Sequence, residues 1–347
     1  MFIECKDRYK KKLFLPLLPI SNEMDQLKSI TQSLENELES FNALYKKALE
    51  SHIPDFQFML DFISKKKGKR IRPLIVLLSA KLGGEITQKT LEYAVTLELL
   101  HIATLIHDDV VDNTTERRGQ PSVMAQYDNR AAVLLGDYIL SKAIVQSVET
   151  ENLTVLKIMS HLAQNLVVGE LIQLVSSSEI IVDEKRYFDI IWKKTAVLLS
   201  SCMQIGAISV NASPEKVEKL RLIGANLGIC FQIKDDLFDY FEQGNLGKPT
   251  GNDIRERKIT LPLIYALNNA PKEKSEAMLS IIQQQDFSVE NIRLLTDFAK
   301  EYKGIEYAQA KMEEIKKNTL LLFDEFPNSE AKTNLIRLMD YIIEREK

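Results

Sequence analysis

The pattern Asp-Asp-x-x-Asp occurs twice in the chain, with a spacing that suits metal or phosphate chemistry. Its outer aspartates are Asp108 and Asp112 in the first copy, and Asp235 and Asp239 in the second. Residues four apart differ by about 40° around an α-helix, so the two carboxylates of a pair share one helix face. Each motif is therefore predicted to present a two-carboxylate edge.

Apolar helical stretches lead into both motifs, at 97–106 and at 223–233. The carboxylates are thus predicted to lie near C-terminal helix ends, where mutual repulsion and the negative end of the helix dipole disfavour them. A bound cation would compensate. Mg²⁺ takes carboxylate oxygens and completes its coordination shell with water and substrate phosphates. Two facing edges would therefore clamp a diphosphate through bridging metal ions.

Basic residues lie close to both motifs in the sequence. One acidic motif alone is commonly a solvated helix end, and one basic cluster alone is commonly a solvated surface. Together they favour separate metal-binding and phosphate-binding groups, because arginine and lysine are the usual ligands of phosphate oxygens. The Gly-x-x-x-x-Gly-Lys-Ser/Thr loop of nucleotide kinases is absent from the sequence. The basic clusters are found at 67–72, 117–118 and 248–258.

Long helices with few breaks are predicted to position these groups. Apolar residues recur at three-to-four spacing from about residue 24 onward, and only 13 Gly and 10 Pro interrupt the 347 residues. No break is long enough for an interdomain linker. The fold is therefore predicted to be all-α, a single domain at 24–347 with about ten or more helices around a central cavity.

Residues 1–23 are predicted to be a poorly ordered extension. They combine basic residues with a short apolar run that contains Pro16 and Pro19 and that no small-residue cleavage site follows. Both Met1 and Met24 are candidate translation starts. No run of 18 or more apolar residues occurs, so no transmembrane segment is predicted.

The overall charge and the cysteines favour a cytoplasmic protein without a nucleic-acid partner. The formal net charge is −4, which gives no electrostatic basis for binding nucleic acid. The cysteines show neither metal-binding nor redox spacing, and their odd number suits a reducing compartment. They are Cys5, Cys202 and Cys230.

These segments together resemble the trans-prenyl diphosphate synthase (polyprenyl synthetase) family, and most closely its long-chain, octaprenyl-type members. The resemblance extends from about Gly68 to Pro262. Several motifs in the family's order make it far more specific than one acidic motif. They are GKRIRP at 68–73, LHIATLIHDDVVD at 100–112, RRG at 117–119, GD at 136–137, KT at 194–195, FQIKDDLFD at 231–239 and GKPTGNDIRERKITLP at 247–262.

The resemblance implies an isoprenoid-synthase-type bundle that binds about three Mg²⁺ ions with diphosphate. Asp108 and Asp112 would bind two ions, and Asp235 would bind the third with help from Asp239. The residues implied to hold the allylic diphosphate are Arg117, Lys194, Thr195, Gln232 and Lys248. Those implied to hold the diphosphate of isopentenyl diphosphate are Lys69, Arg72, His101 and Arg118.

The implied reaction joins isopentenyl diphosphate to an allylic prenyl diphosphate, head to tail and in trans geometry. The allylic C–O bond would ionise, and metal ions and cationic side chains would stabilise the departing pyrophosphate. The isopentenyl double bond would then attack, and pyrophosphate would accept the proton that is lost. The residues implied to act in catalysis are Asp108, Asp112, Lys194, Asp235 and Lys248. A homodimer and product release at a membrane surface also follow from the resemblance.

Product length is predicted from the helix that carries the first motif. In the family, bulky aromatic residues four or five positions before the first aspartate stop the chain at farnesyl length. Those positions hold Thr104 and Ala103, which are small. A long-chain polyprenyl diphosphate for quinone side chains is therefore expected, with a geranylgeranyl or other shorter product as the alternative. Both residues would also suit simple packing, in which case another helix sets the length.

Two further functions compete with chain elongation. A terpene cyclase shares the fold and the first motif but ordinarily lacks the isopentenyl site and the second Asp-Asp-x-x-Asp. A non-catalytic synthase subunit would be expected to lose acidic or basic motif residues, and none is missing from this sequence. Activity of the purified chain alone separates both alternatives from a synthase.

Overall fold

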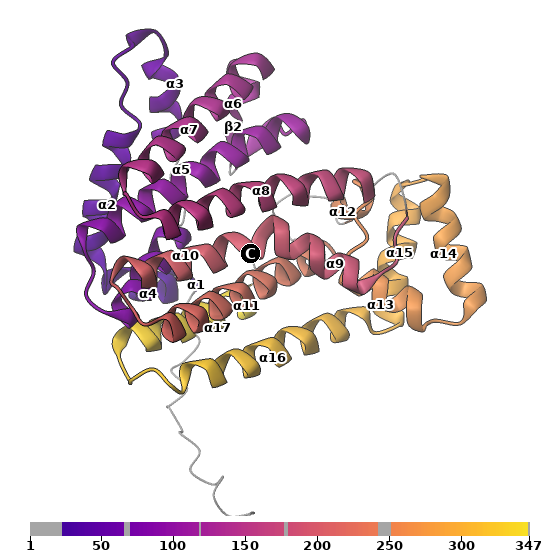
Figure 1. The fold of residues 1–347 in the computed structure, drawn as a ribbon. Helices are drawn as coiled ribbons and strands as arrows, with labels where there is room; N and C mark the ends of the chain where they lie inside the picture. The colour runs from indigo at the N-terminus through magenta and orange to yellow at the C-terminus, as the bar shows by residue number, and fades with distance from the viewer. Residues whose placement is uncertain (1–22, 66–69, 118, 177–179, 242–250, 346–347) are drawn as a thin grey trace, which may run out of the picture.

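The computed structural model describes residues 23–65, 70–117, 119–176, 180–241 and 251–345. These residues form a bundle of helices with one small hairpin (Figure 1). The all-α prediction is confirmed, as is the prediction of ten or more helices. The predicted extension at 1–23 lies almost wholly outside the described residues.

The first half of the chain supplies the upper and left-hand helices of Figure 1. A two-residue antiparallel hairpin follows the first acidic motif, with β1 (Glu116–Arg117) paired to β2 (Gln120–Pro121). The helices are α1 (Glu23–Gln32), α2 (Glu35–Ala48), α3 (Pro54–Ser64), α4 (Ile71–Gly83), α5 (Gln88–Val111), α6 (Val123–Gln126), α7 (Asn129–Glu149) and α8 (Leu153–Ser176).

The second half of the chain crosses beneath the first and closes the bundle. It contains one π-helical turn, η1 (Trp192–Ala196), between two α-helices. The helices are α9 (Glu184–Ile191), α10 (Val197–Ser209), α11 (Pro214–Phe238), α12 (Asn252–Arg255), α13 (Leu261–Asn269), α14 (Lys272–Gln284), α15 (Val289–Glu301), α16 (Gly304–Phe323) and α17 (Glu330–Glu344).

Helix α10 is the central helix, packed against α4, α5, α8 and α11. Two glycines let these neighbours approach closely. A Cβ on Gly206 would lie 2.4 Å from the Val76 carbonyl oxygen of α4, and one on Gly224 would lie 2.5 Å from the Leu199 carbonyl oxygen of α10. Because α11 and α5 both rest on this buried helix, the ends that carry the acidic motifs are fixed relative to each other.

Local capping signals explain where the two motif-bearing helices begin. Thr87 and Thr90 form a capping box at the start of α5, which satisfies amide groups that lack helical partners. At the start of α11, the Ser213 side chain accepts from the Lys216 amide and Pro214 takes the first helical position. Both helices then continue unbroken to their aspartates.

Helices α7 and α8 expose unusually apolar faces. On α8, Val167, Leu171 and Leu174 are exposed at four- and three-residue spacing, and on α7, Leu134 and Val145 are 69% and 56% exposed. By length and composition alone both helices could cross a membrane, although 33% and 22% of their most apolar windows are buried inside the bundle. Such continuous apolar surface generally marks a contact with another molecule.

Candidate active site

Both acidic motifs lie at C-terminal helix ends, as the sequence predicts. Asp112 is the C-cap residue of α5, and Asp239 is the C-cap residue of α11. Asp108 and Asp235 lie one turn earlier on their helices. The macrodipole therefore opposes these carboxylates and favours a cation beside them.

Asp108 is half-buried, with two acidic and two basic side chains around it. Burial raises the pKa of Asp108 to about 7, with further raising by the charges of Glu170 and Asp112 and an opposing effect of Lys194 and Arg117. Glu170, on α8, makes an ion pair of 2.8 Å with Lys194. The sequence analysis missed Glu170, because the residue belongs to neither acidic motif and only the packing of α8 brings it to this site.

Lys194 and Thr195 lie on the π-helical turn η1, a type of element that is frequent at functional sites. Lys194 donates to the Gln173 side chain at 3.2 Å, and the Thr195 hydroxyl donates to the Gln232 amide oxygen at 2.7 Å. Gly169 lets α8 pack tightly here, because a Cβ there would lie 3.0 Å from the Lys194 backbone nitrogen. The structure thus brings three predicted residues together: Lys194, Thr195 and Gln232.

The middle aspartate of each motif has a structural role. Arg117 donates from Nε to the Asp109 carboxylate at 2.7 Å, which anchors the β1–β2 hairpin to α5.

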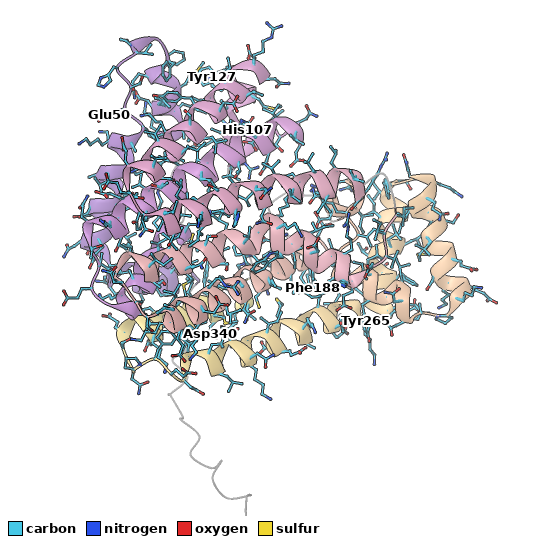
Figure 2. The ribbon with its side chains drawn as sticks, viewed as in Figure 1. Glu50, His107, Tyr127, Phe188, Tyr265 and Asp340 are labelled. Atoms are coloured by element: carbon cyan, nitrogen blue, oxygen red, sulfur yellow. The ribbon has the colours of Figure 1, made fainter. Side chains whose placement is uncertain are left out.

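His107 of α5, labelled in Figure 2, contacts α7, with its Nε2 3.3 Å from the Asp137 carboxylate. A Cβ on Gly136 would lie 2.3 Å from that nitrogen. The Gly-Asp pair at 136–137 therefore makes room for His107 and contacts it.

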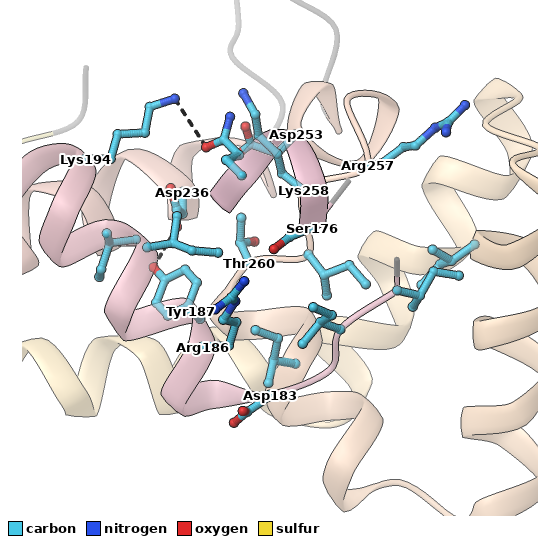
Figure 3. Close-up of a pocket in the computed structure, with 18 of the residues that line it drawn as sticks. Ser176, Asp183, Arg186, Tyr187, Lys194, Asp236, Asp253, Arg257, Lys258 and Thr260 are labelled. Carbon is cyan, nitrogen blue, oxygen red and sulfur yellow. Dashed lines mark hydrogen bonds between the residues drawn. The ribbon is translucent and has the colours of Figure 1, made fainter. Parts of the chain in front are cut away.

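Asp236, the middle aspartate of the second motif, is buried and held on two sides. The Tyr187 hydroxyl donates to one carboxylate oxygen at 2.6 Å, and the Gln232 amide donates to the other at 2.8 Å. Figure 3 shows Tyr187 directly beside Asp236 at the wall of a cavity. Burial raises the pKa of Asp236, and the two hydrogen bonds oppose that rise. Tyr187 was not predicted, because its partner is 49 residues away.

Asp239 supports the loop that follows α11. One of its oxygens accepts from the Asn252 amide at 2.8 Å, and the other accepts from the Asp253 amide at 2.9 Å. Gly251 precedes them with a φ of +77°, and a Cβ there would lie 2.1 Å from the Ile292 side chain, so this position requires glycine. Asp239 therefore fixes the start of α12, and its predicted help with a metal ion stays a prediction.

Lys258 is a cation between the two motifs that the predicted site did not include. Burial lowers its pKa, but its contact with Glu256 and the charges of Asp253 and Asp112 outweigh that effect and raise the pKa. Its charge also acts on Asp236. Lys258 also lines one cavity together with Asp236 and Lys194.

The group predicted to hold isopentenyl diphosphate is only partly described. Arg72 lies in the first turn of α4, and His101 lies on the buried side of α5. Three predicted residues lie outside the described part of the chain: Lys69, Arg118 and Lys248.

A cavity of about 500 Å³ adjoins the second motif (Figure 3). Its polar lining includes Lys194, Gln232, Asp236 and Lys258. Isoleucines from α9, α13 and α14 and from the segments beside α9 and α13 form much of the rest. The described lining residues come from the α8 to α14 side of the bundle, whereas the predicted path of the product tail runs along α5.

The side chains fit Mg²⁺ that arrives together with phosphate. In the described part of the chain, no three His, Cys, Asp or Glu side chains gather as a preformed metal cluster. Proteins usually hold Mg²⁺ through one or two carboxylates and substrate phosphates, and the aspartates at the end of α5 supply such carboxylates. Burial, the main cause of the raised pKa of Asp108, disfavours its ionised form, and a bound cation would offset that effect. Asp108, Asp112 and Asp235 would hold the metal, which would neutralise phosphate charge.

Binding of Mg²⁺ is expected to release protons near neutral pH. The folded-state pKa of Asp108 lies above its ordinary value of 3.8, so between about pH 4 and 7 the folded protein binds more protons than the unfolded chain. This carboxyl group therefore lowers the stability of the metal-free protein as pH rises through that window, and Mg²⁺ should reverse the loss.

Calorimetric titration with Mg²⁺ and pyrophosphate at pH 6.5, in buffers of different ionisation enthalpy, measures the released protons. The proton release due to Asp108 should disappear in Asp108→Asn and should be small at pH 8.5. Equal proton release by the variant and the parent protein would contradict this assignment.

Comparison with known proteins agrees with this geometry. The polyprenyl synthetase family model matches residues 54–298. The chain is 30% identical over 322 residues to octaprenyl diphosphate synthase of Escherichia coli, covering 92% of this chain and 99% of that protein. The chain therefore belongs to the polyprenyl synthetase family. It is a polyprenyl diphosphate synthase, a prenyltransferase of isoprenoid biosynthesis.

Solved structures share the fold over nearly their whole length. A polyprenyl synthase of Caulobacter crescentus, in complex with calcium and isoprenyl diphosphate, superposes with a TM-score of 0.84 at 28% identity, covering 92% of this chain and 98% of that one. A geranylgeranyl pyrophosphate synthase of Bacteroides thetaiotaomicron superposes with a TM-score of 0.79 at 39% identity, covering 92% and 100%.

Proposed function

We propose that this trans-prenyl diphosphate synthase adds isopentenyl diphosphate repeatedly to an allylic diphosphate and makes a long-chain product for quinone side chains. The observation that carries the substrate assignment is the pair of acidic motifs at helix ends, with Lys194 and Lys258 in the cavity beside the second motif and Arg72 set apart on α4. Carboxylates suit metal-bound diphosphate, and a separate cation group suits a second diphosphate.

Each side chain has a distinct task in this mechanism. About three Mg²⁺ ions, when bound, would stabilise the negative charge of the departing pyrophosphate. Lys194 and Lys258 add fixed positive charge at the same place, while Thr195 and Gln232 orient the diphosphate through their hydrogen-bonded pair. The allylic C–O bond breaks, the isopentenyl double bond forms the new C–C bond, and pyrophosphate takes the released proton. No protein base is needed.

Product length is the finer part of the proposal. The small residues Ala103 and Thr104 and the similarity to octaprenyl diphosphate synthase support a long chain. A twenty-carbon product is the second candidate, because the geranylgeranyl pyrophosphate synthase is the more similar in sequence, at 39% identity.

Incubation of the purified chain with Mg²⁺, isopentenyl diphosphate and farnesyl diphosphate, followed by mass spectrometry of the products, tests both parts. We expect a series of polyprenyl diphosphates that extends beyond geranylgeranyl diphosphate. Absence of any elongation by the chain alone would overturn the catalytic proposal. A single twenty-carbon product would overturn only the long-chain part.

We also propose that the enzyme is a cytoplasmic homodimer that releases its product at a membrane surface. The exposed apolar faces of α7 and α8 support the dimer, because contact with a second copy would bury apolar surface that is otherwise exposed to water. The described cysteines Cys202 and Cys230 are free and buried, which suits a reducing compartment.

The double variant Leu134→Glu/Val145→Glu is expected to convert the dimer to a monomer, because two carboxylates would be buried at the interface. Light scattering after size exclusion measures the mass. Leu321→Glu, at a 62% exposed leucine of α16, is the matched control and should remain dimeric. If the parent protein instead fractionates with membranes as an integral protein, the apolar faces of α7 and α8 contact lipid rather than a second copy.

A further inference from the structure

The second acidic motif is engaged by a residue from the far end of the chain. Arg345, the C-cap residue of α17, donates from Nη2 to Asp235 Oδ1 at 2.5 Å. The same nitrogen donates to the Phe231 carbonyl oxygen at 3.1 Å. These two acceptors lie one turn apart on α11, so the guanidinium group is docked on the face that carries the predicted metal ligand.

This ion pair differs from the exposed pairs elsewhere on the surface. Only 8% of the Arg345 side chain is exposed, against 39% of the Asp235 side chain. The guanidinium carbon lies 4.1 Å from the Phe231 ring centroid and 5.4 Å from that of Phe238. Aromatic rings on α11 therefore hold the cation in a desolvated place, where electrostatic interactions are stronger than in water.

We propose that Arg345 is an internal counter-ion for Asp235, which Mg²⁺ must displace when it binds with diphosphate. Arg345 is then a positioning residue that sets the metal affinity of the second motif. This inference rests on the proposed metal-binding role of Asp235.

Electrostatics makes the two cations competitors. A carboxylate carries one negative charge, and a guanidinium and a divalent ion on the same carboxylate would lie only a few ångströms apart. At a partly buried site, salt screens that repulsion poorly. In the free enzyme, Arg345 neutralises Asp235. Once Mg²⁺ and diphosphate are both present, the double positive charge of Mg²⁺ and its contacts with the diphosphate favour the metal over Arg345.

Because Arg345 lies at the end of α17, its displacement from Asp235 should cost the fold little free energy. Its backbone has left the helix, with φ −52° and ψ 142°, and only its amide, bonded to the Tyr341 carbonyl at 3.0 Å, ties it to the last turn. Terminal helical turns open at low free-energy cost. The guanidinium group can therefore leave Asp235 while the rest of α17 stays packed on α4 and α11.

Titration with Mn²⁺ as a paramagnetic substitute for Mg²⁺, in the presence of inorganic pyrophosphate, tests this inference. Electron paramagnetic resonance counts the free ion. Arg345→Gln is expected to tighten one class of sites about tenfold, equivalent to about 1.4 kcal/mol. Arg337→Gln, at an exposed arginine of the same helix, is the matched control and should bind like the parent protein. Arg345→Lys keeps the positive charge but not the planar guanidinium group, so its Mn²⁺ affinity should lie between those of Arg345→Gln and the parent protein.

Unchanged or weaker Mn²⁺ binding by a folded Arg345→Gln would overturn the counter-ion role. If that variant does not fold, Phe231→Leu removes the stacking platform but keeps the charge, and its Mn²⁺ affinity must then exceed that of the parent. Adding Asp235→Asn to Arg345→Gln identifies the site. The class of Mn²⁺ sites that Arg345→Gln tightens should be lost in this double variant. Retention of every Mn²⁺ site by Asp235→Asn would instead overturn the metal role of Asp235, a failure of the proposed function itself.

Discussion

Asp108→Ala is expected to remove nearly all turnover, with a loss of about 10²–10³-fold in kcat, while the helical fold persists. The carboxylate is the first aspartate of its motif and is half-buried near Glu170, Lys194 and Asp112. Without it, the metal that neutralises the departing pyrophosphate would lose a ligand. No other described carboxylate of α5 occupies that face one turn before the helix end.

The same substitution should leave the metal-free protein as stable as before, or more stable, at pH 8. Burial raises the pKa of Asp108 to about 7, so the ionised carboxylate is disfavoured where it stands. Kinetics with farnesyl diphosphate and thermal unfolding by circular dichroism measure the two effects. Asp297→Ala, at an exposed carboxylate of α15, is the control and should change neither. Turnover by Asp108→Ala within tenfold of the parent would contradict the proposed role.

Much of the fold could be predicted because its signals are local. Apolar periodicity marks the long helices, and helix-terminal residues such as Gly83 and the Ser213-Pro214 pair mark their ends. The hairpin at β1 and β2 was not predicted, because strands of two residues have no periodicity. The π-helical turn was not predicted either, since it arises where Gly169 and Gly228 let α8 and α11 approach the chain closely.

The candidate site was predictable where one segment carries the chemistry. The aspartates lie where helical spacing places them, and Lys194, Thr195 and Gln232 come together as the resemblance implies. Residues that act through tertiary contact gave no local signal. Glu170 reaches Lys194 only through the packing of α8, and Arg345 reaches Asp235 across 110 residues of sequence. The sequence contains both residues but not their proximity.

The structure distinguishes between the two residues that were predicted to set product length. Ala103 is 1% exposed and enclosed by the core, whereas Thr104 is half-buried. Thr104 also lies one turn before Asp108 and about 40° from it around α5, directly below the proposed metal ligand. Its hydroxyl donates to the His101 carbonyl at 2.8 Å, so it is held by its own helix. Thr104 is therefore the better candidate for a residue beside the growing tail.

Thr104→Phe is expected to shift the products from long chains to about farnesyl length, because the ring would obstruct a tail that runs along α5 below Asp108. Ala103→Phe should instead lower the free energy of unfolding by roughly 1–3 kcal/mol, the usual cost of overpacking a filled core. Ala94→Phe, at another 1% exposed alanine of α5, is the matched control for overpacking alone and should keep the parent product length. Mass spectrometry of the products and urea unfolding measure both effects. If Thr104→Phe made the same products as the parent protein, another helix would limit product length. The reason is steric, since a phenylalanine one turn from the reacting diphosphate would obstruct any tail that elongates beside it.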